Sequence, residues 1–66
     1  MTGDELQTLR GNIGSSQMRL ESELVKLQQI ADEIRREGLQ GGRDIAIAMT
    51  NIEQGLLWLR QVSDKI

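Results

Sequence analysis

The feature that most constrains the fold is a pair of apolar stripes with helical spacing, separated by a cluster of glycines. Within each stripe the residues follow one another at alternating steps of three and four, which brings them to one face of an α-helix. The stripes are Leu20, Leu24, Leu27, Ala31 and Ile34, then Ile45, Ala48, Ile52, Gly55, Leu59, Val62 and Ile66. Proline is absent, and no strand-length window alternates β-branched with polar residues. The sequence therefore predicts an all-α protein.

The glycine cluster predicts where the two helices end and begin. Gly38, Gly41 and Gly42 follow the first stripe, and a glycine shortly after the last turn is a common helix stop. We expect a first long helix over residues 15–37, a loop over 38–43 and a second long helix over 44–66. Each helix would have about 23 residues and a length of about 34 Å. Matched helices across a short link predict an antiparallel helical hairpin that forms a single domain.

The N-terminal segment, residues 1–14, predicts a short helix followed by a kink. Gly11 and Gly14 interrupt it, and glycine in a helix interior is about 1 kcal/mol less favourable than alanine. One of the two serines that come next would then cap the first long helix. The alternative is a single helix that runs unbroken from Asp4, but the two glycines favour the break.

Several apolar side chains fall outside both stripes and have no place in the contact between two helices. They are Met18, Val25 and Ile30 in the first helix and Met49, Leu56, Leu57 and Trp58 in the second. An exposed patch of this kind normally marks an interface. A chain of 66 residues builds only a marginal core, and the absence of cysteine and histidine removes disulfides and the usual metal ligands as reinforcement. We therefore predict a homo-oligomer.

The second helix would supply the predicted oligomer interface. Gly55 lowers helix propensity in the middle of this helix. The close approach of a backbone from another subunit would explain a glycine at this position. Trp58 is interpreted as a packing anchor rather than a ligand platform, with a backbone carbonyl or Glu53 as the partner of its indole N–H. The full predicted interface is Met49, Ile52, Gly55, Leu56, Trp58 and Leu59.

Composition also limits the classes of function. Without His, Cys or Tyr, acid–base or nucleophilic chemistry would depend on Asp, Glu, Lys or Ser, and no catalytic spacing of these is recognisable, so we expect no enzyme. We expect neither a cofactor nor a metal. The net charge of −2 argues against a general DNA binder, and any anionic ligand would need local cationic groups. No secretory signal pattern or membrane span is recognisable, so we expect a cytoplasmic protein.

The residues between Arg43 and Arg60 follow a specific order. An arginine precedes small and aliphatic residues, a threonine and a glutamate stand one turn apart, and an aliphatic–Trp–Leu sequence closes the pattern. The residues are Arg43, Ala46, Ala48, Thr50, Ile52, Glu53, Gly55, Leu57, Trp58 and Leu59. This order resembles the C-terminal helix of the phage anti-CBASS sponge family, small proteins that sequester cyclic oligonucleotides. A similar helix occurs in the hairpin domain of the related anti-Thoeris sponges, which bind cyclic ADP-ribose signals.

The resemblance implies a homohexamer of hairpins that holds cyclic di- or trinucleotides, or cyclic ADP-ribose isomers, between subunits in the host cytoplasm without cleaving them. In the family, the nucleotide contacts come from the N-terminal kink and from a lysine of the first long helix. The kink would correspond here to "RGNIGSS" and the lysine to Lys26. Glycines and free N–H groups at a helix start suit a phosphate. The implied ligand residues are Arg10, Gly11, Asn12, Ile13, Gly14, Ser15 and Lys26.

The chain departs from the family in having no Tyr or Phe to stack on a base at the kink. Arg10 or Ile13 would have to replace that contact. Simpler interpretations stand beside these: Lys26 forms an ordinary exposed pair with Glu23, and the glycine-rich stretch is a helix-breaking linker. Two further arginines, Arg36 and Arg43, are expected at the hairpin tip. They either compensate the helix dipole or line a second anion site.

A different class of function also fits the apolar surface. Two hairpins in a four-helix bundle can leave a groove that accepts an amphipathic helix of another protein. RNA is a weaker candidate for such a module, because the balance of charge is acidic and stacking aromatics are lacking.

Overall fold

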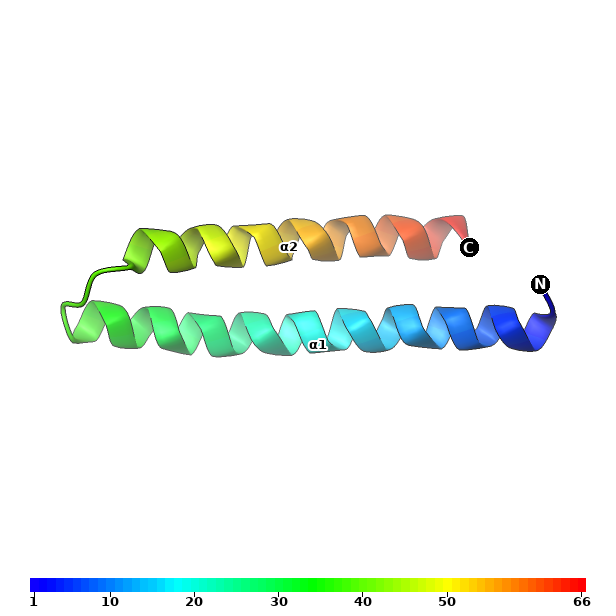
Figure 1. Ribbon diagram of the computed structural model, residues 1–66, viewed down its shortest axis with the longest axis horizontal. Helices are drawn as coiled ribbons and strands as arrows, with labels where there is room; N and C mark the ends of the chain where they lie inside the picture. Colours follow the sequence, from blue (N-terminus) through cyan, green and yellow to red (C-terminus); the bar gives the residue numbers. More distant parts are fainter.

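The computed structural model describes residues 1–66 and contains two helices, α1 (Gly3–Arg36) and α2 (Gly42–Lys65). They lie antiparallel and side by side in one elongated hairpin of 53 × 15 × 11 Å (Figure 1). The predictions of an all-helical chain and of a helical hairpin are confirmed. Neither helix has the length and apolarity that a membrane-spanning segment needs.

The predicted break in the N-terminal segment is wrong, because α1 is one helix of 34 residues. Its N-cap is Thr2, whose hydroxyl oxygen accepts a hydrogen bond from the Glu5 N–H at 3.2 Å. Gly11 and Gly14 have ordinary helical backbone angles. The apolar spacing continues through the segment 6–13, so one amphipathic face extends along the whole helix and outweighs the low propensity of two glycines.

The turn between the helices follows the sequence prediction more closely. Arg35 and Arg36 occupy the last turn of α1, and the chain then turns through Gly38 and Gly41, with φ of 66° and 107°. These left-handed angles are the reason for glycine at both positions. Helix α2 begins at Gly42, two residues earlier than expected, and Asp44 lies in its first turn, where an acidic group favours the helix dipole.

The core is a single seam between the two helices. Leu56 is the one buried residue, with 5% of its surface exposed. The first predicted stripe is half-buried throughout, as is the second except for Val62, which is exposed. The apolar residues predicted to lie outside the seam on α1 are exposed, and so are Leu57 and Trp58 on α2. Most of the apolar surface is therefore only partly covered within one protomer.

Helix α1 is longer than α2, and its first turns project past the end of α2 (Figure 1). Two polar contacts join the helices near this end. The Arg10 guanidinium donates a hydrogen bond to the Ile66 carbonyl, and Arg60 forms an ion pair with Glu21 at 3.7 Å. The turns before Arg10 thus have no α2 residues beside them, although Leu6 and Leu9 lie on the apolar face.

Candidate functional site

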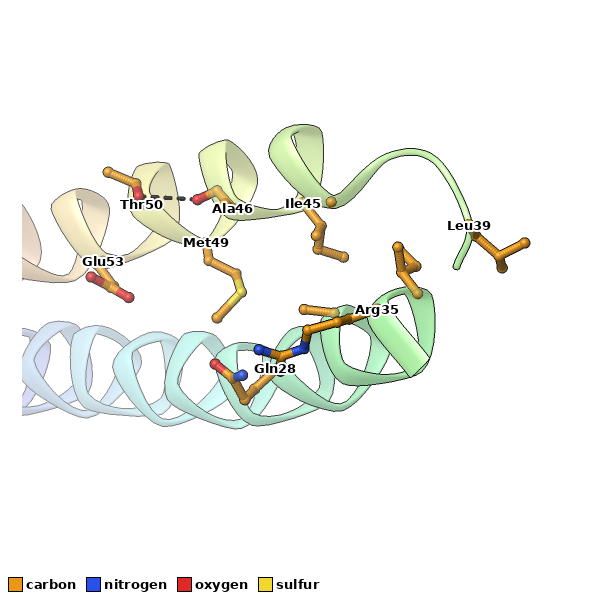
Figure 2. Close-up of a pocket in the computed structure, with 11 residues that line it drawn as sticks. Gln28, Arg35, Leu39, Ile45, Ala46, Met49, Thr50 and Glu53 are labelled. Carbon is orange, nitrogen blue, oxygen red and sulfur yellow. Dashed lines mark hydrogen bonds between the residues drawn. The ribbon is translucent and has the colours of Figure 1, made fainter. Parts of the chain in front are cut away.

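A groove of about 570 Å³ lies between the two helices near the tip of the hairpin. Its volume falls in the range of about 300–1,000 Å³ that is typical of small-molecule sites. Figure 2 shows Ile45 and Met49 extending from α2 toward α1, while the Arg35 side chain runs along α1 toward Gln28. The lining residues are Gln28, Ala31, Ile34, Arg35, Leu39, Gly42, Ile45, Ala46, Met49, Thr50 and Glu53.

Small residues on both helices create this groove. Ala31 on α1 and Gly42 and Ala46 on α2 carry little or no side chain, so the space beside the seam is not filled. Ile34 and Ile45 are half-buried and form an apolar floor, and Met49 adds a flexible, polarisable side chain. The result is an apolar surface that suits the face of a planar ring.

Polar groups stand on both sides of the floor. On α1, the Asp32 carboxylate accepts a hydrogen bond from the Gln28 amide at 3.3 Å and forms an ion pair with Arg35. On α2, the Thr50 hydroxyl donates to the Ala46 carbonyl at 3.0 Å. Glu53 has no hydrogen-bond or ion-pair partner in the protomer and is therefore available to a ligand.

These groups define what the groove can bind. The Gln28 amide can donate and accept, and the Glu53 carboxylate can accept from N–H groups at the edge of a heterocycle. The Arg35 guanidinium can contact a phosphate. No group of three or more Asp and Glu side chains gathers in a metal-binding arrangement. The lining thus combines an apolar floor with one amide, one guanidinium and one carboxylate group.

The predicted phosphate cradle at the N-terminal kink is wrong for the protomer. Gly11, Asn12, Ile13, Gly14 and Ser15 lie in the interior of α1, where each backbone N–H bonds to the carbonyl four residues earlier. A continuous helix leaves no free N–H groups for an anion at this point. Arg10, at the start of the same stretch, is used to contact Ile66.

Lys26 lies far from that stretch. It is about 24 Å along the helix from Arg10, at 1.5 Å per residue. Its ammonium group forms an ion pair with Glu23 at 3.5 Å, and 65% of the side chain is exposed. One protomer therefore does not bring Lys26 and the Arg10–Ser15 segment together. A shared site would need two copies of the chain.

The two arginines predicted to form a second anion site lie at the same end of the hairpin. Arg36 belongs to the last turn of α1 and forms an ion pair with Glu33. Arg43 belongs to the first turn of α2, is exposed and has no ion-pair partner. No contact joins them, and Arg35 lines the groove in place of Arg36.

The predicted interface residues fall into three groups by burial. Leu56 packs within the hairpin, so its assignment outside the intramolecular seam is wrong: it lies four residues after Ile52 and shares that helix face. Met49, Ile52, Gly55 and Leu59 are half-buried. Trp58 is 67% exposed, and its indole N–H has no hydrogen-bond partner.

The tip groove was missed from the sequence alone. Gln28 and Arg35 lie seven residues apart, a spacing that places them on one side of α1, but nothing in the sequence shows that a hollow lies beside them. The one sequence feature that points to the groove is the Arg43–Leu59 order on α2, because three of its residues line the groove: Ala46, Thr50 and Glu53.

Comparison of the chain with protein-family models, with curated proteins and with solved structures gave no match. The resemblance to the phage sponges therefore rests on the residues between Arg43 and Arg60 and on the hairpin layout. The kink, which was the third point of likeness, is missing in this protein.

Proposed function

We propose that this chain forms a homo-oligomer, a hexamer as in the resembled family, that binds cyclic di- or trinucleotides and holds them uncleaved. It would act in the cytoplasm of an infected bacterium and block CBASS-type signalling by withholding the signal from its effector. The observation that carries the proposal is the place of the Arg43–Leu59 pattern. It forms α2 of a helical hairpin, and three of its residues line a groove of about 570 Å³.

The groove offers complementary contacts for one nucleotide unit. A base would lie on the apolar floor formed by Ile34 and Ile45, beside Met49. Gln28 and Glu53 would contact its polar edges. Arg35 would exchange its exposed contact with Asp32 for a phosphate oxygen. Such an exchange is easy because exposed ion pairs contribute only about 0–1 kcal/mol.

A cyclic nucleotide has several bases joined by phosphates, so its symmetry suits a site made by several copies of the chain. Each copy would supply one groove for one base. Lys26 of a neighbouring copy would add a second cation for the phosphates, since its partner in the protomer is the exposed Glu23.

The proposed role is sequestration rather than catalysis. Purified protein is incubated with a panel of cyclic dinucleotides, cyclic trinucleotides and cyclic ADP-ribose isomers, and melting temperature and free ligand are measured. A ligand that binds only the folded protein must raise the melting temperature. We expect depletion of at least one ligand and its recovery with unchanged mass after heating. No shift and no depletion across the panel would contradict the proposal, and recovery of a linear product would contradict sequestration.

A second candidate is an interaction module that docks an amphipathic helix of another protein. The exposed apolar side chains favour it, Leu57 and Trp58 in particular. A synthetic amphipathic helix that binds the assembled protein with low dependence on salt, together with no response to the nucleotide panel, would favour this alternative.

A further inference from the structure

One side of α2 carries a stripe that borders the seam, with which it shares Gly55 and Val62, and that lies away from the groove. We define the α2 stripe as Ile47, Asn51, Gly55, Trp58 and Val62. At 3.6 residues per turn these positions lie within about 80° of one another around the helix. The α2 residues that line the groove, such as Met49 and Glu53, lie on the opposite side by the same spacing.

The large side chains of the stripe are apolar, and the protomer leaves them exposed. Ile47, Trp58 and Val62 are exposed by 49%, 67% and 42%. Large aliphatic and indole groups aligned along one helix side form a surface that normally meets a partner.

Four of the five stripe positions are symmetric about one point of α2. Its midpoint lies between Gln54 and Gly55, and Ile47 and Val62 are equally distant from that point. The same holds for Asn51 and Trp58.

Charges just beyond the stripe continue the symmetry. Asp44 and Lys65 also lie at equal distances from the midpoint and on the same side of α2, and neither has an ion-pair partner in the protomer. Their signs are opposite, so the stripe is complementary to a reversed copy of itself.

We propose that α2 pairs antiparallel with α2 of a second copy, about a two-fold axis beside Gly55. Ile47 then faces Val62 of the partner subunit, and the Asn51 amide oxygen is placed to accept the hydrogen bond of the partner's Trp58 indole N–H. Asp44 and the partner's Lys65 attract one another, and a parallel pairing would instead bring like charges together.

Gly55 supplies an independent reason for the crossing point. A Cβ atom added at Gly55 would meet nothing within 4 Å, so packing inside the protomer does not require glycine at this position. Two helices that cross beside a glycine can bring their backbones unusually close. The residue that lowers helix propensity in mid-helix thus lies at the point of closest approach.

This pairing rests on the assembly part of the proposed function, but its test needs no nucleotide. The chain has no cysteine, so two single variants, Ile47→Cys and Val62→Cys, report the register. In the antiparallel pair residue 47 faces residue 62, whereas two copies of residue 47 lie about 22 Å apart. A disulfide needs Cα atoms within about 7 Å.

We expect a mixture of the two variants to form covalent dimers under mild oxidation, and each variant alone to form few, at least fivefold fewer in the same time. Efficient cross-linking of either variant with itself, or none in the mixture, would overturn the pairing. If the variants fail to fold, wild-type protein decides: a monomer at micromolar concentration would also overturn it.

The outcome is separate from that of the nucleotide panel. Cross-linking in this register by a protein that depletes no cyclic nucleotide leaves the pairing standing and contradicts the proposed function. Nucleotide depletion without cross-linking contradicts the pairing alone.

Discussion

Leu56 and Trp58 stand two residues apart on α2 and have opposite environments: Leu56 is 5% exposed, and Trp58 is 67% exposed. A step of two residues turns the helix by about 200°, so one side chain enters the seam with α1 and the other points away from it. The protomer therefore leaves its largest apolar side chain mostly uncovered. Substitutions at Leu56 should therefore affect the stability of the hairpin, and substitutions at Trp58 should affect its assembly.

Replacement of Leu56 by alanine removes the only buried side chain of the seam. Truncation of a buried leucine is typically destabilising by about 2–5 kcal/mol, and in so small a core we expect a loss of that size. Urea denaturation followed by circular dichroism measures it. Leu57→Ala is the matched control, because the same atoms are removed from an exposed site. Equal losses in the two variants would mean that the seam is assigned to the wrong residues.

Replacement of Trp58 by alanine should weaken association and leave helix content nearly unchanged. The side chain contributes little to the protomer, but large aromatic residues often dominate the energy of an interface. Sedimentation velocity over a range of protein concentrations gives the measurement, with Gln29→Ala at an exposed polar position of α1 as a control. An undiminished oligomer in the Trp58 variant would remove Trp58 from the interface.

Replacement of Gly11 by alanine tests the unbroken α1. Gly11 has helical angles, and an added Cβ meets nothing within 4 Å, so alanine should stabilise the hairpin by up to about 1 kcal/mol. Gly38→Ala is the control with the opposite sign, since its φ of 66° is unfavourable for alanine. Thermal denaturation compares both with wild type. A Gly11 variant with lower helix content would favour the kink.

Replacement of Arg35 by alanine should weaken nucleotide binding by about 1–3 kcal/mol if its guanidinium meets a phosphate. Lys26→Ala should have an effect of the same sign without altering assembly, because its partner in the protomer is an exposed glutamate. Calorimetric titration with the ligand found in the panel measures both affinities. Arg19→Ala, which removes an arginine without an ion pair, is the charge-matched control. An unchanged affinity in the Arg35 variant would exclude the tip groove as the site.

The parts of the fold that follow from apolar spacing could be predicted from the sequence. The stripe from Leu20 to Ile34 and the stop at Gly38 need only helix periodicity and the φ angle of a turn. The continuity of α1 does not follow from local propensity, because Gly11 and Gly14 predict a break, whereas the apolar face that passes through them decides the outcome. Local propensity is a weak guide when an amphipathic pattern continues across it.

The candidate site was harder to predict because a groove depends on what is missing between two helices. The small size of Ala31 and Ala46 matters only once the register places both beside the same gap. The burial of Leu56 is hard to predict for a related reason. Steps of three and of four from Ile52 lead to Gly55 and Leu56, and both positions lie near the seam. Only the packed hairpin shows that Leu56 is the one that is buried.

Mass spectrometry under native conditions, with and without the nucleotide panel, tests most directly whether this hairpin hides its remaining apolar surface against copies of itself and binds its ligand there. We expect an oligomer at micromolar concentration, whose mass increases by that of intact cyclic nucleotide. A folded monomer that retains no nucleotide would contradict both.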